Sequence, residues 1–127
     1  MAPSMEPIIK ESRDVRKISD YLECLTYFSS LMGVLPDSMH KAIMKGKAFE
    51  EKWTSMYGQV TWNDVKFQVS EDGEFFVVYD AESQAKNMAD EPFVLHMDVR
   101  LDFTIKNGRI KFGGREQKPK YVPTFFG

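Results

Sequence analysis

His96 and Asp98 are the two side chains in this 127-residue chain whose types and spacing best suit proton transfer. One residue separates them in a segment of alternating apolar and polar residues, so on a β-strand both side chains lie on the same face. A carboxylate beside an imidazole fixes its tautomer, which suits a general acid or base. Alternatively, the two belong to an exterior or dimer-facing row of paired charges, because the opposite face of the segment is uniformly apolar. This row comprises His96, Asp98, Arg100 and Asp102.

Tyr21 and Tyr79 carry phenol groups that could act with this pair. A buried phenol can donate a hydrogen bond to an enolate-like oxygen as negative charge develops on it. Tyr21 belongs to an apolar helical stripe, which favours it over Tyr27. Tyr79 alternates with Val77 and is therefore expected to point toward the core. The alternative for each is a core tyrosine with a hydrated hydroxyl.

Large apolar side chains could line a ligand pocket beside these groups. Methionine adapts to ligands of varied shape, and an apolar pocket with a few polar groups is the usual site for a small molecule. Ordinary core packing explains the same residues equally well. The set comprises Phe28, Met32, Met44, Phe49, Trp53, Met56, Phe67 and Met97. A small hydrophobic ligand or substrate is the partner that they predict.

The composition argues against several other functions. Seventeen basic and nineteen acidic residues give a net charge of -2, whereas nucleic-acid binders normally carry a basic excess. Cys24 is the only cysteine, His40 belongs to no zinc-like spacing, and no glycine-rich phosphate loop occurs, so we expect no disulfide, metal or cofactor. No apolar run resembles a signal peptide or a membrane span. A cytoplasmic protein without a nucleic-acid or membrane partner is expected.

The chain length predicts a single domain. Residues 1–11 are polar and contain proline, which predicts a flexible N-terminal arm, and residues 12–127 form the domain. A first helix is predicted from Ser12, as its N-cap, to Gly33, as its C-terminal glycine. Its apolar stripe comprises Val15, Ile18, Leu22, Leu25, Ser29 and Met32.

Two further helical segments precede the point where the spacing of apolar residues changes from that of a helix to that of a strand. A short helix over residues 37–45 is predicted to end at Gly46, and a third segment covers residues 47–57. Alternation with a period of two then predicts strands over residues 65–70, 73–82 and 95–106. Asn107 and Gly108 form a two-residue hairpin signal, because both central positions of that turn need positive φ. Helices followed by an antiparallel sheet predict an α+β fold, with the first helix covering the apolar sheet face.

The order of elements, the segment GKAFEEKWTSMYG and the late strand pair LDFTIKNGRIKFGG resemble the NTF2-like superfamily. This group includes SnoaL-like polyketide cyclases and ketosteroid isomerases. The resemblance covers about Val15 to Gln117. It implies a cystatin-like or NTF2-like cone, in which N-terminal helices pack on a strongly bent antiparallel sheet around an apolar pocket. It also implies a homodimer, formed through the outer sheet face.

The chain departs from the isomerases of this family at their acidic positions. The stretch DSMHKAIMKGKAF is helical in pattern where the family has a strand with an acidic base. Val99 stands where the late-strand acid would lie once Leu101 and Phe103 occupy inward positions. Ketosteroid isomerase chemistry is therefore not supported.

The sequence predicts two alternative functions. The first is a cofactor-independent cyclase, isomerase or dehydratase acting on a hydrophobic oxygenated small molecule, with Tyr21 or Tyr79 polarising an oxygen while His96 and Asp98 move the proton. The second is a non-catalytic module for ligand binding or dimerisation. The direction of the His96 row discriminates between them. A row that faces the pocket favours the enzyme, and a row that faces outward favours a binding module or a dimer interface.

Overall fold

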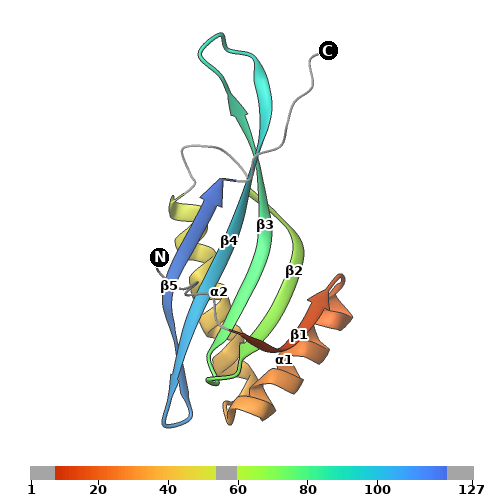
Figure 1. Ribbon diagram of the computed structural model, residues 1–127, viewed down its shortest axis with the longest axis vertical. Helices are drawn as coiled ribbons and strands as arrows, with labels where there is room; N and C mark the ends of the chain where they lie inside the picture. The colour runs from red at the N-terminus through yellow and green to blue at the C-terminus, as the bar shows by residue number, and fades with distance from the viewer. Residues whose placement is uncertain (1–7, 54–59, 120–127) are drawn as a thin grey trace.

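The computed structural model describes residues 8–53 and 60–119, without the side chains of residues 50–53, 85 and 119. One strand, two helices and four further strands follow one another along the chain (Figure 1). Their bounds are β1 Ile9–Val15, α1 Ile18–Met32, α2 Pro36–Trp53, β2 Val60–Ser70, β3 Phe75–Lys86, β4 Pro92–Lys106 and β5 Arg109–Pro119. The strands form one antiparallel sheet in the order β1-β2-β3-β4-β5. The predicted α+β class is confirmed.

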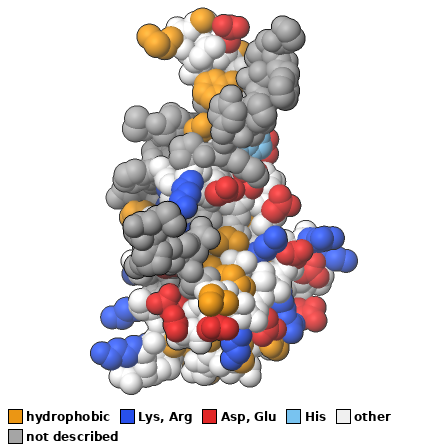
Figure 2. All heavy atoms as spheres, viewed as in Figure 1, with side chains coloured by type: hydrophobic (Ala, Val, Ile, Leu, Met, Phe, Trp, Pro, Cys, Tyr) orange, Lys and Arg blue, Asp and Glu red, His pale blue; other side chains and the backbone are white. Residues whose placement is uncertain are grey.

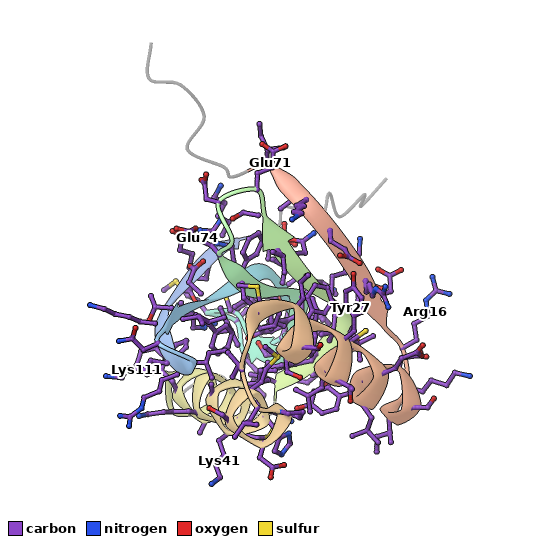
Figure 3. The ribbon with its side chains drawn as sticks, turned by 90° about the horizontal axis from the view of Figure 1, so that it is seen from below. Arg16, Tyr27, Lys41, Glu71, Glu74 and Lys111 are labelled. Atoms are coloured by element: carbon purple, nitrogen blue, oxygen red, sulfur yellow. The ribbon has the colours of Figure 1, made fainter. Side chains whose placement is uncertain are left out.

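The two helices pack against one face of this sheet, and the strands arch over them (Figure 3). The edge strands β1 and β5 do not pair with each other among the described residues, so the sheet is not closed. We call the face opposite the helices the outer face. The cone implied by the NTF2-like resemblance stays a prediction.

The first helix begins later than the sequence pattern predicts. Ser12 is not an N-cap but lies in β1, where its hydroxyl accepts a hydrogen bond from Gln68 of β2 at 3.3 Å. Residues 9–11, which we assigned to an arm, are part of the same strand. Pairing with β2 satisfies the backbone groups of this segment and outweighs its helical spacing. The N-cap of α1 is Lys17.

The buried face of α1 is also rotated from the predicted stripe. Ile18 and Leu22 of the stripe are 80% and 56% exposed. Leu25 and Ser29 are buried as predicted, together with Cys24 and Phe28. The rotation arises because α1 packs against β1, an edge strand of the sheet, with the Cys24 Sγ 4.0 Å from the Asp14 carbonyl oxygen. The predicted end of α1 is confirmed, since Gly33 has φ of 68° and donates to the last carbonyls of the helix.

The predicted break at Gly46 is wrong, because α2 runs through it as one helix. A Cβ at Gly46 would lie 3.2 Å from both Leu101 and Phe112, so this glycine allows close packing of α2 on the sheet. Residues 54–57 of the predicted third segment lie outside the described residues.

The core lies between the helices and the inner face of the sheet. Phe28 of α1 packs on Phe67 and Phe75, with ring centroids 6.1 and 5.8 Å apart. Val77 and Leu101, on the central strands, are fully buried below this aromatic layer. The predicted hairpin is confirmed, with positive φ at Asn107 and Gly108. Neither described helix has the length and apolar content that a membrane crossing needs.

Candidate functional site

The His96 row faces away from the helices. On β4 the residues that alternate with it are all buried on the inner side of the sheet, namely Met97, Val99, Leu101 and Phe103. Because successive side chains of a strand point to opposite faces, the row lies on the outer face. Figure 2, viewed onto this face, shows acidic and basic side chains interspersed over its lower half.

His96 is paired with Asp80 of β3, not with Asp98. The distance between His96 Nδ1 and Asp80 Oδ2 is 3.1 Å. In the β3–β4 register Asp80 faces Asp98 and Glu82 faces His96, so the bond runs diagonally. A carboxylate only accepts, so His96 Nδ1 carries the hydrogen and Nε2 of the neutral ring is left as an acceptor. The predicted pair is therefore replaced by a pair between neighbouring strands.

The carboxylate of Asp80 is the more deeply placed member of this pair. Its side chain is 11% exposed and that of His96 is 28% exposed. The second oxygen, Oδ1, is buried without a hydrogen-bond partner. Asp98, another carboxylate, faces it directly on β4. Like charges placed opposite each other destabilise a sheet, and an unpaired buried oxygen adds to that cost. Lys118 of β5 faces Asp98 from the other side and brings a positive charge next to the two carboxylates.

A cavity of about 810 Å³ opens on the outer face and receives side chains from all five strands. Two neighbouring rows of the sheet line it with charges of both signs. The first row carries Asp64, Asp80 and Asp98 and ends with Lys118 of β5, and we call it the acidic row. The second row carries Asp14, Lys66, Val78, Arg100 and Glu116. Residues two apart on a strand are separated by about 7 Å, which is the spacing of the two rows.

A β-bulge in β2 brings Asp64 to the acidic row. Asn63 faces Asp80 and Lys66 faces Val78, so Asp64 and Val65 together oppose Tyr79. Asp64 has φ of 52°, which is the left-handed conformation typical of one bulge class and tolerated by Asp. Bulges of this kind redirect side chains beside binding sites.

Arg100 is held by two carboxylates. Its Nε lies 2.9 Å from Asp102 Oδ1 and 4.0 Å from Glu116 Oε2, and its guanidinium lies 5.0 Å from the centroid of the Phe76 ring. Burial raises the pKa of Asp102, and the positive charge of Arg100 offsets this effect only in part. Phe76 is 2% exposed although it points to the outer face.

The predicted phenols lie apart from His96. A hydrogen bond of 2.6 Å between the Tyr21 hydroxyl and His40 Nδ1 links α1 to α2, and burial raises the pKa of Tyr21. Tyr79 belongs to the core, where it stacks on Trp62 with centroids 4.1 Å apart, and it also borders the cavity. Tyr27 donates to Glu11 at 2.7 Å. The structure therefore does not bring Tyr21 together with the His96 row.

The predicted apolar lining lies on the helix side of the sheet. Phe28, Phe67 and Met97 are core residues, and Met32 packs against them. Phe49 is exposed and contacts Phe112, with ring centroids 5.4 Å apart. The side chain of Trp53 lies outside the described part of the chain. None of the described members borders the outer cavity. Within residues 8–53 and 60–119, no three His, Cys, Asp or Glu side chains form a metal-binding group.

Asp64, Lys66 and Asp80 are the site residues that sequence reasoning missed. Asp80 carried a usable signal, because it follows Tyr79, which the alternation placed on the inner face. The bulge that redirects Asp64 has no comparable signal in the sequence.

Comparisons with protein-family models, curated proteins and solved structures found no match for the chain. The resemblance to the NTF2-like superfamily stays a prediction.

Proposed function

We propose that the protein is a non-catalytic binding module whose ligand occupies the cavity on the outer face. The observation that carries the proposal is the outward direction of the His96 row, which the sequence had identified as the feature that separates a binding module from an enzyme. The cavity lies against charged side chains of both signs, which provide orientation and specificity for a polar ligand.

Titration of a small-molecule library, followed in amide NMR spectra, tests this proposal. We expect the resonances of Lys66, Asp98 and Arg100 to shift with a ligand, while those of the core residue Phe28 stay in place. The substitution Arg100→Gln should weaken such a ligand, and the substitution Lys41→Gln on α2 is the matched control, because Lys41 is exposed on the far side of the molecule (Figure 3). Ligands that shift only resonances of α1 and α2 would contradict the proposal.

A second candidate is the cofactor-independent cyclase, isomerase or dehydratase. The bond between Asp80 and His96 favours it, since it orients the imidazole and leaves Nε2 free to take a proton. The proton step now rests on this pair, because Tyr21 lies between the helices. Turnover of an identified substrate that survives both His96→Ala and Asp80→Asn would exclude this candidate.

The homodimer through the outer face is a third use of the same surface. A second copy seated there would compete with the proposed ligand for Lys66 and Asp98. Light scattering over a range of protein concentrations, with and without the substitution Arg100→Glu, tests it. A dimer that persists in that variant would show that the outer face is not the interface.

A further inference from the structure

We infer that residues 120–124, which directly follow β5, extend that strand along the part of β4 that no other described strand covers. The end of the β3–β4 hairpin then becomes a sheet of three strands. Residues 120–127 lie outside the described residues, and their sequence is KYVPTFFG. Three features point to this pairing, namely a projecting ribbon of two strands, the exposed apolar side chains on it, and the positions of two prolines.

The far end of the β3–β4 hairpin projects beyond the rest of the sheet, and we call residues 84–96 the ribbon (Figure 1). Among the described residues, β2 pairs with β3 only as far as Ser83, and β5 pairs with β4 only as far as Met97. The pairs between β3 and β4 themselves continue to Lys86 and Pro92. Two paired strands without a third are marginally stable in water, so an added strand would stabilise the ribbon.

The ribbon exposes apolar side chains. Phe93 and Val94 of β4 are 43% and 42% exposed, and Met88 at the turn is fully exposed. The turn is held by Asn87, whose side-chain oxygen accepts two backbone hydrogen bonds within it. An apolar strand with a free edge pairs readily with another chain, and natural sheets normally protect such edges. We therefore expect a cover, and the nearest chain is the one that leaves β5 at Pro119.

The prolines of this segment occur at the positions that an edge strand tolerates. Pro119 has no N–H and pairs with Met97, so this pair is not hydrogen-bonded and the nitrogen of Pro119 faces away from β4. Hydrogen-bonded and non-hydrogen-bonded pairs alternate along antiparallel strands, so in the same register Lys120 and Val122 are the next residues to bond to β4. Pro123 then falls where its missing N–H also faces solvent.

The side chains of the segment also suit the edge that it would cover. Continued without a shift, the β4–β5 register places Tyr121 opposite Leu95 and Val122 opposite Val94. Aromatic and β-branched residues are typical of strands and form favourable cross-strand pairs. Because the segment starts beside β4, its pairing within one chain closes no loop, and it is favoured over the same segment of a second copy. The occupant that we assign to the edge is therefore the chain's own C-terminal segment.

Amide hydrogen exchange of the full chain, followed by NMR, tests the pairing. In this register the N–H of Val94 points toward the segment, whereas that of Leu95 points toward Ser83 of β3. We expect both amides to exchange at least about tenfold more slowly than an unpaired amide. Val122→Pro removes an N–H aimed at β4, so it should abolish the protection of Val94 and leave that of Leu95. Tyr121→Pro removes an N–H that faces solvent, and this matched control should leave both protected.

Three results would overturn the inference. The first is a Val94 amide that exchanges like an unpaired one in the full chain while Leu95 is protected. The second is equal loss of protection at Val94 in Val122→Pro and Tyr121→Pro, because the register predicts different effects. The third is protection of Val94 that rises with protein concentration together with a dimer in light scattering, which would identify the segment of a second copy as the occupant. None of these results bears on ligand binding at the outer cavity.

Discussion

Asp80 and His96 lie diagonally across β3 and β4, and their 3.1 Å contact leaves Asp80 with one bonded and one unbonded buried oxygen. The same carboxylate faces Asp98. Like charges placed opposite each other reduce the stability of a sheet, whereas Lys118 of β5, which faces Asp98, acts in the opposite direction. The stability of Asp80 variants therefore reports how much of the repulsion is left.

Replacement of Asp80 by Asn should stabilise the free protein by about 0.5 kcal/mol, because it removes one of two like charges placed opposite each other. The amide oxygen of Asn can still accept from His96, so that bond is kept. Urea unfolding at neutral pH measures the change. The variant Asp98→Asn should gain less, because it also removes the charge that faces Lys118, and the double variant should gain no more than the better single one, since the repulsion is removed only once.

A loss of stability above about 1 kcal/mol in Asp80→Asn would contradict this prediction, since a loss of that size is typical of a broken structural hydrogen bond. It would identify the carboxylate as a structural partner of His96.

The stability difference between the variant Asp102→Asn and the parent chain should depend on pH. The pKa of Asp102 is raised because burial penalises the charged carboxylate, with Arg100 acting in the opposite direction. Because the pKa is raised, the protonated form of Asp102 is the one that stabilises the fold. This contribution is fully present below the ordinary Asp pKa and is lost as the pH rises through the pKa of the folded state. Asp102→Asn should therefore gain stability relative to the parent chain as the pH rises from about 4 to 7.

Chemical unfolding of both proteins across this pH range measures the difference. At pH values below the ordinary Asp pKa the two should be equally stable, because the parent side chain is then neutral as well. A variant that becomes less stable than the parent chain on raising the pH would show that the ion pair with Arg100 outweighs burial.

Local patterns predicted much of the fold. The alternation over residues 65–70 and 95–106, the Asn107–Gly108 turn and the Gly33 cap all correspond to observed elements, because each depends on neighbouring residues. β1 could not be predicted in this way, because it forms by pairing with β2, more than fifty residues later. The residues of β1 fit both the spacing of a helix and the alternation of a strand, and only the pairing with β2 selects the strand.

The site was harder to predict from the sequence than the fold. The alternation of β4 allowed the outward direction of the His96 row, which the structure shows. Whether Asp98 or Asp80 binds His96 depends on the register of β3 and β4. That register is set across a connecting loop and by core packing, and neither appears in local patterns. The position of Asp64 depends in turn on the bulge in β2.

Tyr21 is expected to stabilise the fold and to take no part in ligand binding. Tyr21→Phe removes the hydrogen bond to His40 and keeps the ring on Phe67, so the cost should be about 0.5 kcal/mol. Because burial raises the pKa of this phenol, the folded state loses stability as the pH rises through that pKa, and the variant should lose less. Urea unfolding at pH 8 and above about pH 10 measures both effects. A changed affinity of this variant for a ligand of the outer cavity would contradict the assignment.

Gly46 sets how closely α2 approaches the sheet, and two substitutions separate its packing from its helix propensity. In an exposed helical position Ala is favoured over Gly by about 1 kcal/mol, which the variant Ala48→Gly measures in this same helix. At Gly46 the added Cβ meets Leu101 and Phe112 at 3.2 Å, so Gly46→Ala should gain less than Ala48→Gly loses. Gly46→Val should cost about 1–3 kcal/mol by overpacking. Thermal and urea unfolding measure the three variants, and a gain in Gly46→Ala equal to the loss in Ala48→Gly would show that α2 can move away from β5 without cost.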